Sequence, residues 1–205
     1  MPSPVAHSLL GCALGAAFFV PRDRGASLRA ALRQNRGLLW LSVAAALAPD
    51  VDYLPGLVMG SLNAVHRWYT HTLGWSLLAA LALWLIGRQM PAGGPDRPFA
   101  GKPGRWALAG LTLIAFSHLA ADWMTEDLRP PYGLMALWPI NDHFYIAARS
   151  IFPHLQKADF GQLFCRYNAW VLTVEMAWCL PPLLVVLFYK QIRIRHAGPV
   201  KTGVP

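Results

Sequence analysis

Five apolar segments dominate the chain, separated by basic or Pro- and Gly-rich stretches. They run approximately over residues 5–20, 37–49, 73–87, 106–121 and 169–189. The third segment has no charged residue and is apolar all round, which excludes a helix with one solvated face. Only the last segment approaches the roughly 20 residues that cross a bilayer comfortably, and the others lie near or below the limit of about 17. The pattern predicts an all-α, polytopic membrane bundle of four to five transmembrane helices.

The composition supports a membrane protein. Apolar residues make up 55% of the chain and charged residues only 14%, whereas soluble domains carry about one-quarter charged residues. The 205 residues have room for one domain, so we expect a single membrane-embedded unit over residues 1–190 and a basic, disordered tail over 191–205. The alternative is a soluble bundle in which all five segments share one small core.

Positive charge alternates between the connections. Arg and Lys gather after the first and third segments and in the tail, while the second connection has only Arg67 and the fourth balances its bases with acids. Since Lys and Arg accumulate in cytoplasmic loops, we expect the N-terminus outside and the C-terminus inside. The net charge of +8 then reflects topology and contact with anionic lipids, and nucleic-acid binding is not expected.

Acidic and imidazole side chains stand at the ends of the apolar segments. They occur in the stretches Pro49-Asp50-Val51-Asp52, His66-Arg67-Trp68-Tyr69-Thr70-His71 and Ser117-His118-Leu119-Ala120-Ala121-Asp122, with His7 at the start of the first segment. Up-and-down threading places all of them at one membrane face, which the charge pattern makes the outer one. An Asp at the centre of a membrane helix costs roughly 2.5 to 3.5 kcal/mol, and a divalent metal is a common compensator.

The local spacing is compatible with metal binding. His118 and Asp122 are four residues apart and share one face of a helix. Asp50 and Asp52 follow Pro49, which favours an extended or turn backbone with both carboxylates on one side. A loop or a helix start is expected between His66 and His71. The alternatives are that the two acids cap a helix end or a turn, and that His118 is a hydrogen-bonded packing residue.

Seven side chains are therefore predicted metal ligands: His7, Asp50, Asp52, His66, His71, His118 and Asp122. They exceed the four ligands of one tetrahedral ion, so one or two ions are expected, with zinc preferred. Asp52 and His118 are the predicted catalytic residues, with Asp52 taking the proton from the attacking water. Arg67 and Thr70 are expected to bind a substrate phosphate or to orient a metal ligand, or else to be an interfacial arginine and a helix cap.

The remaining polar residues receive weaker predictions. Glu126 and Asp127 are each possible general bases but are better explained as solvated loop acids. His143 and His154 have no ligand-like spacing. The three cysteines are scattered, so neither a thiolate zinc site nor a disulfide framework is expected.

The order of these motifs resembles the YdjM-like family of bacterial inner-membrane proteins, described as metal-dependent hydrolases. The resemblance rests on His7, Pro-Asp-x-Asp, His-Arg-x-x-Thr-His and Ser-His-x-x-x-Asp over roughly the first two thirds of the chain; Thr72 replaces the usual small residue. It implies a membrane-bound hydrolase with metal ligands at the named positions. The His-x-x-x-Asp element is also loosely similar to zinc-dependent phospholipase C, which favours a phosphoester substrate.

The expected function is thus metal-dependent hydrolysis of a lipid or lipid-linked phosphoester in a bacterial cytoplasmic membrane, with membrane lipids as partners. Two alternatives remain open. One is a non-enzymatic membrane protein whose metal is structural, and the other is an ion-coupled transporter. A catalytic ion keeps an open position, a structural ion is saturated by protein ligands, and a transporter needs polar groups near the midplane.

Overall fold

All five predicted segments are helical. The computed structural model describes residues 1–20, 27–60, 66–89, 104–157 and 161–196. The long helices of these ranges are α1 (Pro4–Phe19), α3 (Arg36–Leu47), α5 (Leu73–Gln89), α6 (Gly104–Trp123) and α7 (Arg166–His196). The described residues form no strand and only two isolated β-bridges, so the all-α prediction is confirmed there.

Four short elements were not predicted by the apolar pattern. They are α2 (Leu28–Gln34), the 3-10 helix η1 (Ala48–Asp52), α4 (Tyr53–Val58) and the 3-10 helix η2 (Gln162–Phe164). Asp50 and Asp52 therefore lie within one short 3-10 helix, in agreement with the turn alternative and not with the extended one. Residues 191–196, expected in the disordered tail, instead continue α7, and 197–205 lie outside the described residues.

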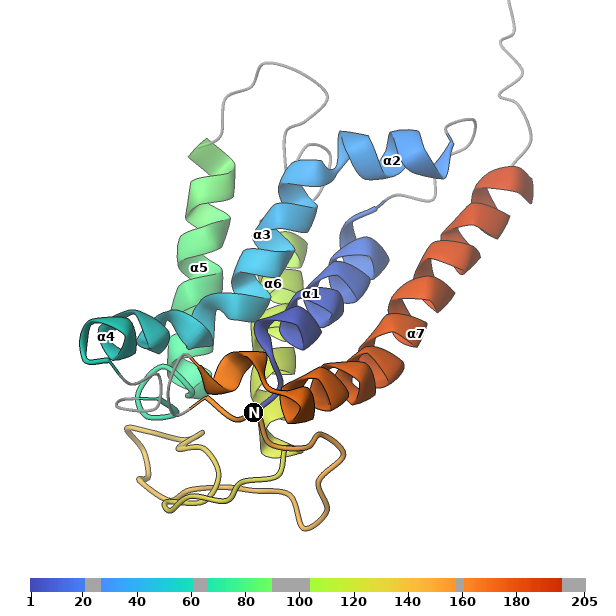
Figure 1. Cartoon of the computed structure of the whole chain (residues 1–205). Coiled ribbons are helices and arrows are strands. Elements are labelled where there is room, and N and C mark those ends of the chain that lie inside the picture. Colours follow the sequence, from blue (N-terminus) through green and yellow to red (C-terminus); the bar gives the residue numbers. More distant parts are fainter. Residues whose placement is uncertain (21–26, 61–65, 90–103, 158–160, 197–205) are drawn as a thin grey trace, which may run out of the picture.

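The helix α1 packs against α3, α6 and α7 (Figure 1). Its contact with α3 is close because the facing residues are small. A Cβ atom added to Gly11 would lie 2.8 Å from the Ala46 Cβ, and one added to Gly15 would lie 2.6 Å from the Ser42 Cβ. Membrane helices commonly associate through such small residues, since lipid provides little hydrophobic driving force between them.

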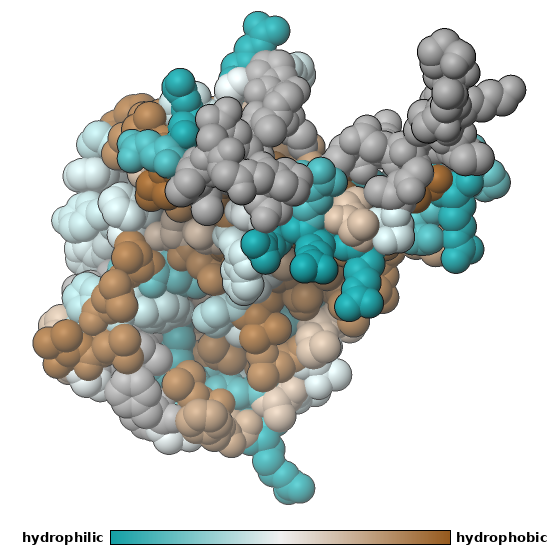
Figure 2. All heavy atoms as spheres, turned by 90° about the horizontal axis from the view of Figure 1, so that it is seen from above, coloured by the Kyte–Doolittle hydropathy of each residue, from teal (hydrophilic) through white to brown (hydrophobic). Residues whose placement is uncertain are grey.

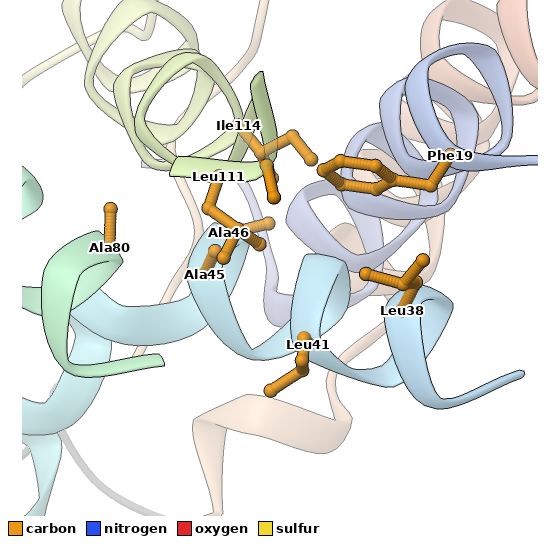
Figure 3. Packing of buried hydrophobic residues seen from close by; sticks show 9 residues of the cluster. Phe19, Leu38, Leu41, Ala45, Ala46, Ala80, Leu111 and Ile114 are labelled. Carbon is orange, nitrogen blue, oxygen red and sulfur yellow. The ribbon is translucent and has the colours of Figure 1, made fainter. Parts of the chain in front are cut away.

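One half of the bundle is filled by an apolar layer contributed by α1, α3, α5 and α6. Figure 3 shows its side chains, which are buried and interdigitate. This apolar layer consists of Phe19, Leu38, Leu41, Ala45, Ala46, Ala80, Ala107, Leu111 and Ile114.

Two stretches are long and apolar enough to cross a membrane, namely Arg36–Val58 and Arg166–His196. The helices α1 and α5 are apolar but shorter, so the number of spans stays a prediction. Much of α7 is exposed, including Trp170, Trp178, Val185 and Phe188. Large exposed apolar surfaces of this kind are typical of contact with lipid or with another protein.

Exposed arginines gather at the end of the bundle formed by α2, the start of α3, the end of α5, the start of α6 and the end of α7. Figure 2 views the molecule from this side and shows hydrophilic side chains among apolar ones. We call it the basic end, and its exposed arginines are Arg29, Arg33, Arg36, Arg88, Arg105, Arg193 and Arg195. The opposite end holds the starts of α1, α5 and α7 and the outer loop between α6 and α7, described over residues 124–157 and 161–165 (Figure 1).

Candidate metal centre

The structure brings all seven predicted ligands to the end opposite the basic end. His7 comes from α1, the two acids of the Pro-Asp-x-Asp motif from η1, and His118 with Asp122 from the last turns of α6. His66 and His71 lie in the turn that precedes α5, as the loop prediction required. All seven side chains are at most 7% exposed. We call this set the polar layer.

Four atoms form the centre of the polar layer. The Nε2 atoms of His71 and His118 lie 3.3 Å apart, and each lies 3.3 Å from Asp122 Oδ2. Asp50 Oδ1 is 3.7 Å from both nitrogen atoms. Ligands about 2.0 to 2.2 Å from a tetrahedral zinc ion are about 3.3 to 3.6 Å from each other. The spacing of His71, His118 and Asp122 therefore fits three ligands of one ion, with the Asp50 carboxylate slightly farther from both imidazoles.

Unpartnered polar atoms are concentrated in the same place. The described part of the chain has nine buried side-chain nitrogen or oxygen atoms without a hydrogen-bond partner, and seven belong to His7, Asp50, His66 and Asp122. Burying such atoms unpaired is costly, so they normally have a partner. A bound cation would satisfy the carboxylate oxygens and the imidazole lone pairs together.

In three histidines, a partner on Nδ1 leaves the Nε2 atom directed toward the centre of the polar layer. His118 donates through Nδ1 to the Ala46 carbonyl at 2.7 Å, and His66 donates through Nδ1 to Asp52 Oδ1 at 2.7 Å. His71 Nδ1 is 3.2 Å from Asp52 Oδ2. A partner on Nδ1 leaves the Nε2 lone pair available for a metal ion and fixes the ring orientation.

Asp52 contacts His66 and His71 through their Nδ1 atoms. Its oxygens accept hydrogen bonds from the Arg67 backbone N–H at 3.1 Å and from the Thr70 hydroxyl at 2.8 Å, in addition to His66. The three groups of ligand atoms that lie within 4.8 Å of one another do not include it. The role of Asp52 as a ligand and general base stays a prediction. Thr70 also points at Asp52.

Two loop histidines have strongly shifted pKa values. Burial, together with the charge of Lys157, lowers the pKa of His66 to about 3, so its imidazole is neutral. Burial opposes a charge on His71, but its hydrogen bonds to the carboxylates of Asp122, Asp50 and Asp52 raise its pKa well above the usual value. Three carboxylates thus attract positive charge to the His71 position, which a divalent ion would supply more effectively than a proton.

His7 gave the weakest sequence signal of the seven but is fully buried. Its ring stacks on that of His118 with centroids 3.7 Å apart, and its Nε2 lies 3.3 Å from Asp122 Oδ1. The two oxygens of Asp122 therefore face different histidines, Oδ1 toward His7 and Oδ2 toward His71 and His118. Carboxylates placed between two sets of ligands are a feature of two-metal sites.

Arg67 forms an ion pair with Asp127 of the outer loop. It has a φ of 73°, a positive value found at no other described non-Gly residue. Such a backbone conformation is strained and is usually kept where it serves a site. The side chain of Asp127 is only 4% exposed and also accepts a hydrogen bond from the Gly133 N–H at 2.8 Å. The expectation of a solvated acid at Asp127 is wrong, because the Arg67 motif and the loop meet only in the tertiary structure.

Sequence reasoning missed Lys157 and Tyr53. Lys157 is 5% exposed and contacts the Tyr53 hydroxyl, and the Tyr53 ring stacks on His66 with centroids 4.2 Å apart. Lys157 has no motif around it, and Tyr53, although it directly follows the Pro-Asp-x-Asp motif, is not a residue type that the metal-ligand pattern selects. Glu126, expected to be solvated, is half-exposed and accepts a hydrogen bond from His154 at 2.9 Å, which lowers the pKa of its carboxyl.

A family model described as YdjM inner membrane protein matches residues 1–197. The chain belongs to the YdjM family. The match extends the resemblance from the first two thirds of the chain through α7. YdjM proteins are described as inner membrane proteins, in agreement with the apolar helices of this chain. Neither the curated proteins nor the solved structures include a match to this YdjM chain.

Proposed function

We propose that the chain is a membrane-bound metal-dependent hydrolase, with zinc as its ion and a phosphoester or lipid-linked phosphoester as its substrate. The observation that carries this proposal is the convergence of two Nε2 atoms and the Asp122 carboxylate at ion-binding distances with unsatisfied oxygens. The bound ion would supply Lewis-acid activation of a water molecule and of the scissile group.

Each residue has a proposed part. His71, His118 and Asp122 would hold the ion, which leaves a fourth position for water beside Asp50, and the catalytic contribution of His118 is made as a ligand through Nε2. Asp52 is a positioning residue, because it holds His71 and His66 by their Nδ1 atoms. The sequence-based role of Asp52 as general base is not retained, since both of its oxygens already accept hydrogen bonds. His7 and His66 flank the centre and leave room for a second ion.

We place the site at the outer face of the membrane. The support is the position of the exposed arginines, which lie at the opposite end of the bundle, together with the preference of Lys and Arg for the cytoplasmic side. The polar layer then meets the lipid–water boundary, where lipid-linked substrates arrive by lateral diffusion.

A structural metal site is the competing function. It would be closed on all sides by protein, whereas His66 lines an open pocket next to the polar layer. A transporter is less well supported, because the ionisable groups lie at one end of the helices and not along a path.

The test is to purify the protein in detergent, measure bound metal, and assay hydrolysis of a generic phosphodiester and of a labelled lipid panel. We expect stoichiometric metal in the parent, loss of both metal and hydrolysis in His118→Ala, and loss of hydrolysis in Asp50→Ala. His143→Ala is the matched control, since that side chain is 77% exposed in the outer loop. A parent without stoichiometric metal after zinc or manganese supplementation would refute the proposal, and metal without hydrolysis would favour the structural role.

A further inference from the structure

A cavity of about 520 Å³ lies beside the polar layer. One wall is the turn from His66 to Trp68, and the other is the outer loop, including Asp127–Pro131 and His154–Lys157. Pockets of a few hundred cubic ångströms suit small molecules or the head group of a larger one. His66 belongs both to this wall and to the polar layer, so a ligand in the pocket would lie next to the metal ligands.

The described lining of the pocket has an excess of positive charge. Its cationic side chains are Arg67, Arg129 and Lys157, and its one carboxylate is Asp127. Asp127 is already paired with Arg67. The remaining cations therefore have no lining carboxylate of their own, and the pocket attracts an anion.

Lys157 is the least expected of these cations. Its ammonium group contacts the Tyr53 hydroxyl, lies 3.8 Å from the Met1 sulfur and stands 4.6 Å from the centroid of the Tyr53 ring. It forms no ion pair with any described carboxylate, although the residue is only 5% exposed. A buried ammonium group is normally paired, so the missing counter-ion is a feature that a ligand would supply.

Aromatic contacts connect this ammonium group to the polar layer. The Tyr53 ring contacts both Lys157 and His66, with the ammonium group 4.6 Å from its centroid and the imidazole stacked on it at 4.2 Å. The His66 Nε2 atom is buried and has no hydrogen-bond partner. An anionic group held by Lys157 would thus be connected to His66 of the polar layer through the Tyr53 ring.

We propose that the pocket binds a phosphoryl group and that Lys157, aided by Arg67 and Arg129, is its anion-binding residue. The identity of this group as part of the substrate rests on the proposed hydrolase function, whereas the anion site itself does not. Apolar side chains such as Leu128, Pro131 and Phe144 complete the lining and suit the non-phosphate part of such a molecule.

The probe is inorganic phosphate, titrated into the detergent-solubilised full chain and followed by calorimetry and by the shift in unfolding temperature. Both zinc-loaded and zinc-free protein are used, because phosphate can also bind zinc directly. We expect Lys157→Met to weaken phosphate binding about tenfold or more in both forms, as for loss of a charge-assisted hydrogen bond. Lys157→Arg should retain binding within about threefold, because the charge and a donor remain.

Two further variants complete the design. Arg129→Gln removes an exposed lining cation that the fold does not need, and should weaken phosphate binding about threefold. Arg149→Met is the matched control, since Arg149 is exposed in the same loop but does not line the pocket, and it should bind like the parent. Phosphate binding is also measured in nanodiscs that contain phosphatidic acid or only phosphatidylcholine, to identify the source of the phosphoryl group. If phosphatidic acid competes with inorganic phosphate, the pocket binds a lipid head group. If it does not compete, the pocket binds a soluble phosphate compound.

The anion site is refuted if the parent binds phosphate no better than chloride, or if Lys157→Met and Arg129→Gln both bind like the parent. If Lys157→Met does not fold, Arg129→Gln and Lys157→Arg decide the question. Phosphate binding that depends on Lys157 in a protein without hydrolysis would overturn the proposed function and leave the anion site standing. Hydrolysis that is unaffected by Lys157→Met and Arg129→Gln would leave the proposed function standing and overturn the assignment of the bound phosphoryl group to its substrate.

Discussion

The helices α1 and α6 and the continuous α3–η1 stretch each contribute to both the apolar layer and the polar layer. Side chains such as Ile114 and His118, one turn apart on α6, are equally buried. The apolar layer is satisfied by its own packing, whereas the polar layer holds most of the unpartnered buried atoms of the described chain. Similar burial in one bundle therefore produces close packing in one layer and unpartnered polar atoms in the other.

The largest expected effect of this difference is on metal removal. With an ion present at about 1,000 times its Kd, binding adds about 4 kcal/mol to the free energy of unfolding. A chelator should remove this stabilisation from the parent, while Asp122→Asn should show almost no response to the chelator. Thermal unfolding with and without zinc measures the difference. Equal unfolding temperatures for the parent in both conditions would contradict the distinction between the layers.

The next effect concerns packing between α1 and α3 and should not depend on metal. Gly15→Ala places a methyl group 2.6 Å from the Ser42 Cβ, so the helices must separate, at a cost of about 1 to 3 kcal/mol. Ser42→Gly in the same chain should restore much of the loss. Gly74→Ala is the control, since its added atom meets nothing closer than 3.8 Å. A stability difference between Gly15→Ala and the parent that changes when chelator is added would contradict the separation of the two layers.

The smallest expected effect comes from Asp52→Asn, at the edge of the polar layer. Loss of a carboxylate that orients metal-bound histidines should lower zinc affinity about tenfold, or about 1.4 kcal/mol, while saturating zinc still restores full occupancy. Competition with a chelating dye measures the affinity, and Asp142→Asn, 90% exposed, is the control. Failure to bind stoichiometric zinc at saturation would return Asp52 to the ligand set.

Much of the helical framework could be predicted because apolar segments of this length have few other stable structures. The short helices α2 and α4 and the two 3-10 helices were not predicted, because their sequences lack a long apolar run. Their formation depends on the neighbouring helices. The ligands His118 and Asp122 could be paired from their spacing on one helix. His7 could not be ranked, because only its stacking on His118 distinguishes it from an ordinary N-terminal residue.

By itself, the sequence determined the long helices, the family membership and the seven candidate ligands at one end of a bundle. These depend on local periodicity and on up-and-down threading, both of which can be read from the order of residues. Only the tertiary structure decided that Asp52 contacts His66 and His71 and that Lys157 is buried at a pocket beside them. Such roles depend on contacts between residues far apart in the chain, as between Lys157 and Tyr53, and no local pattern encodes them.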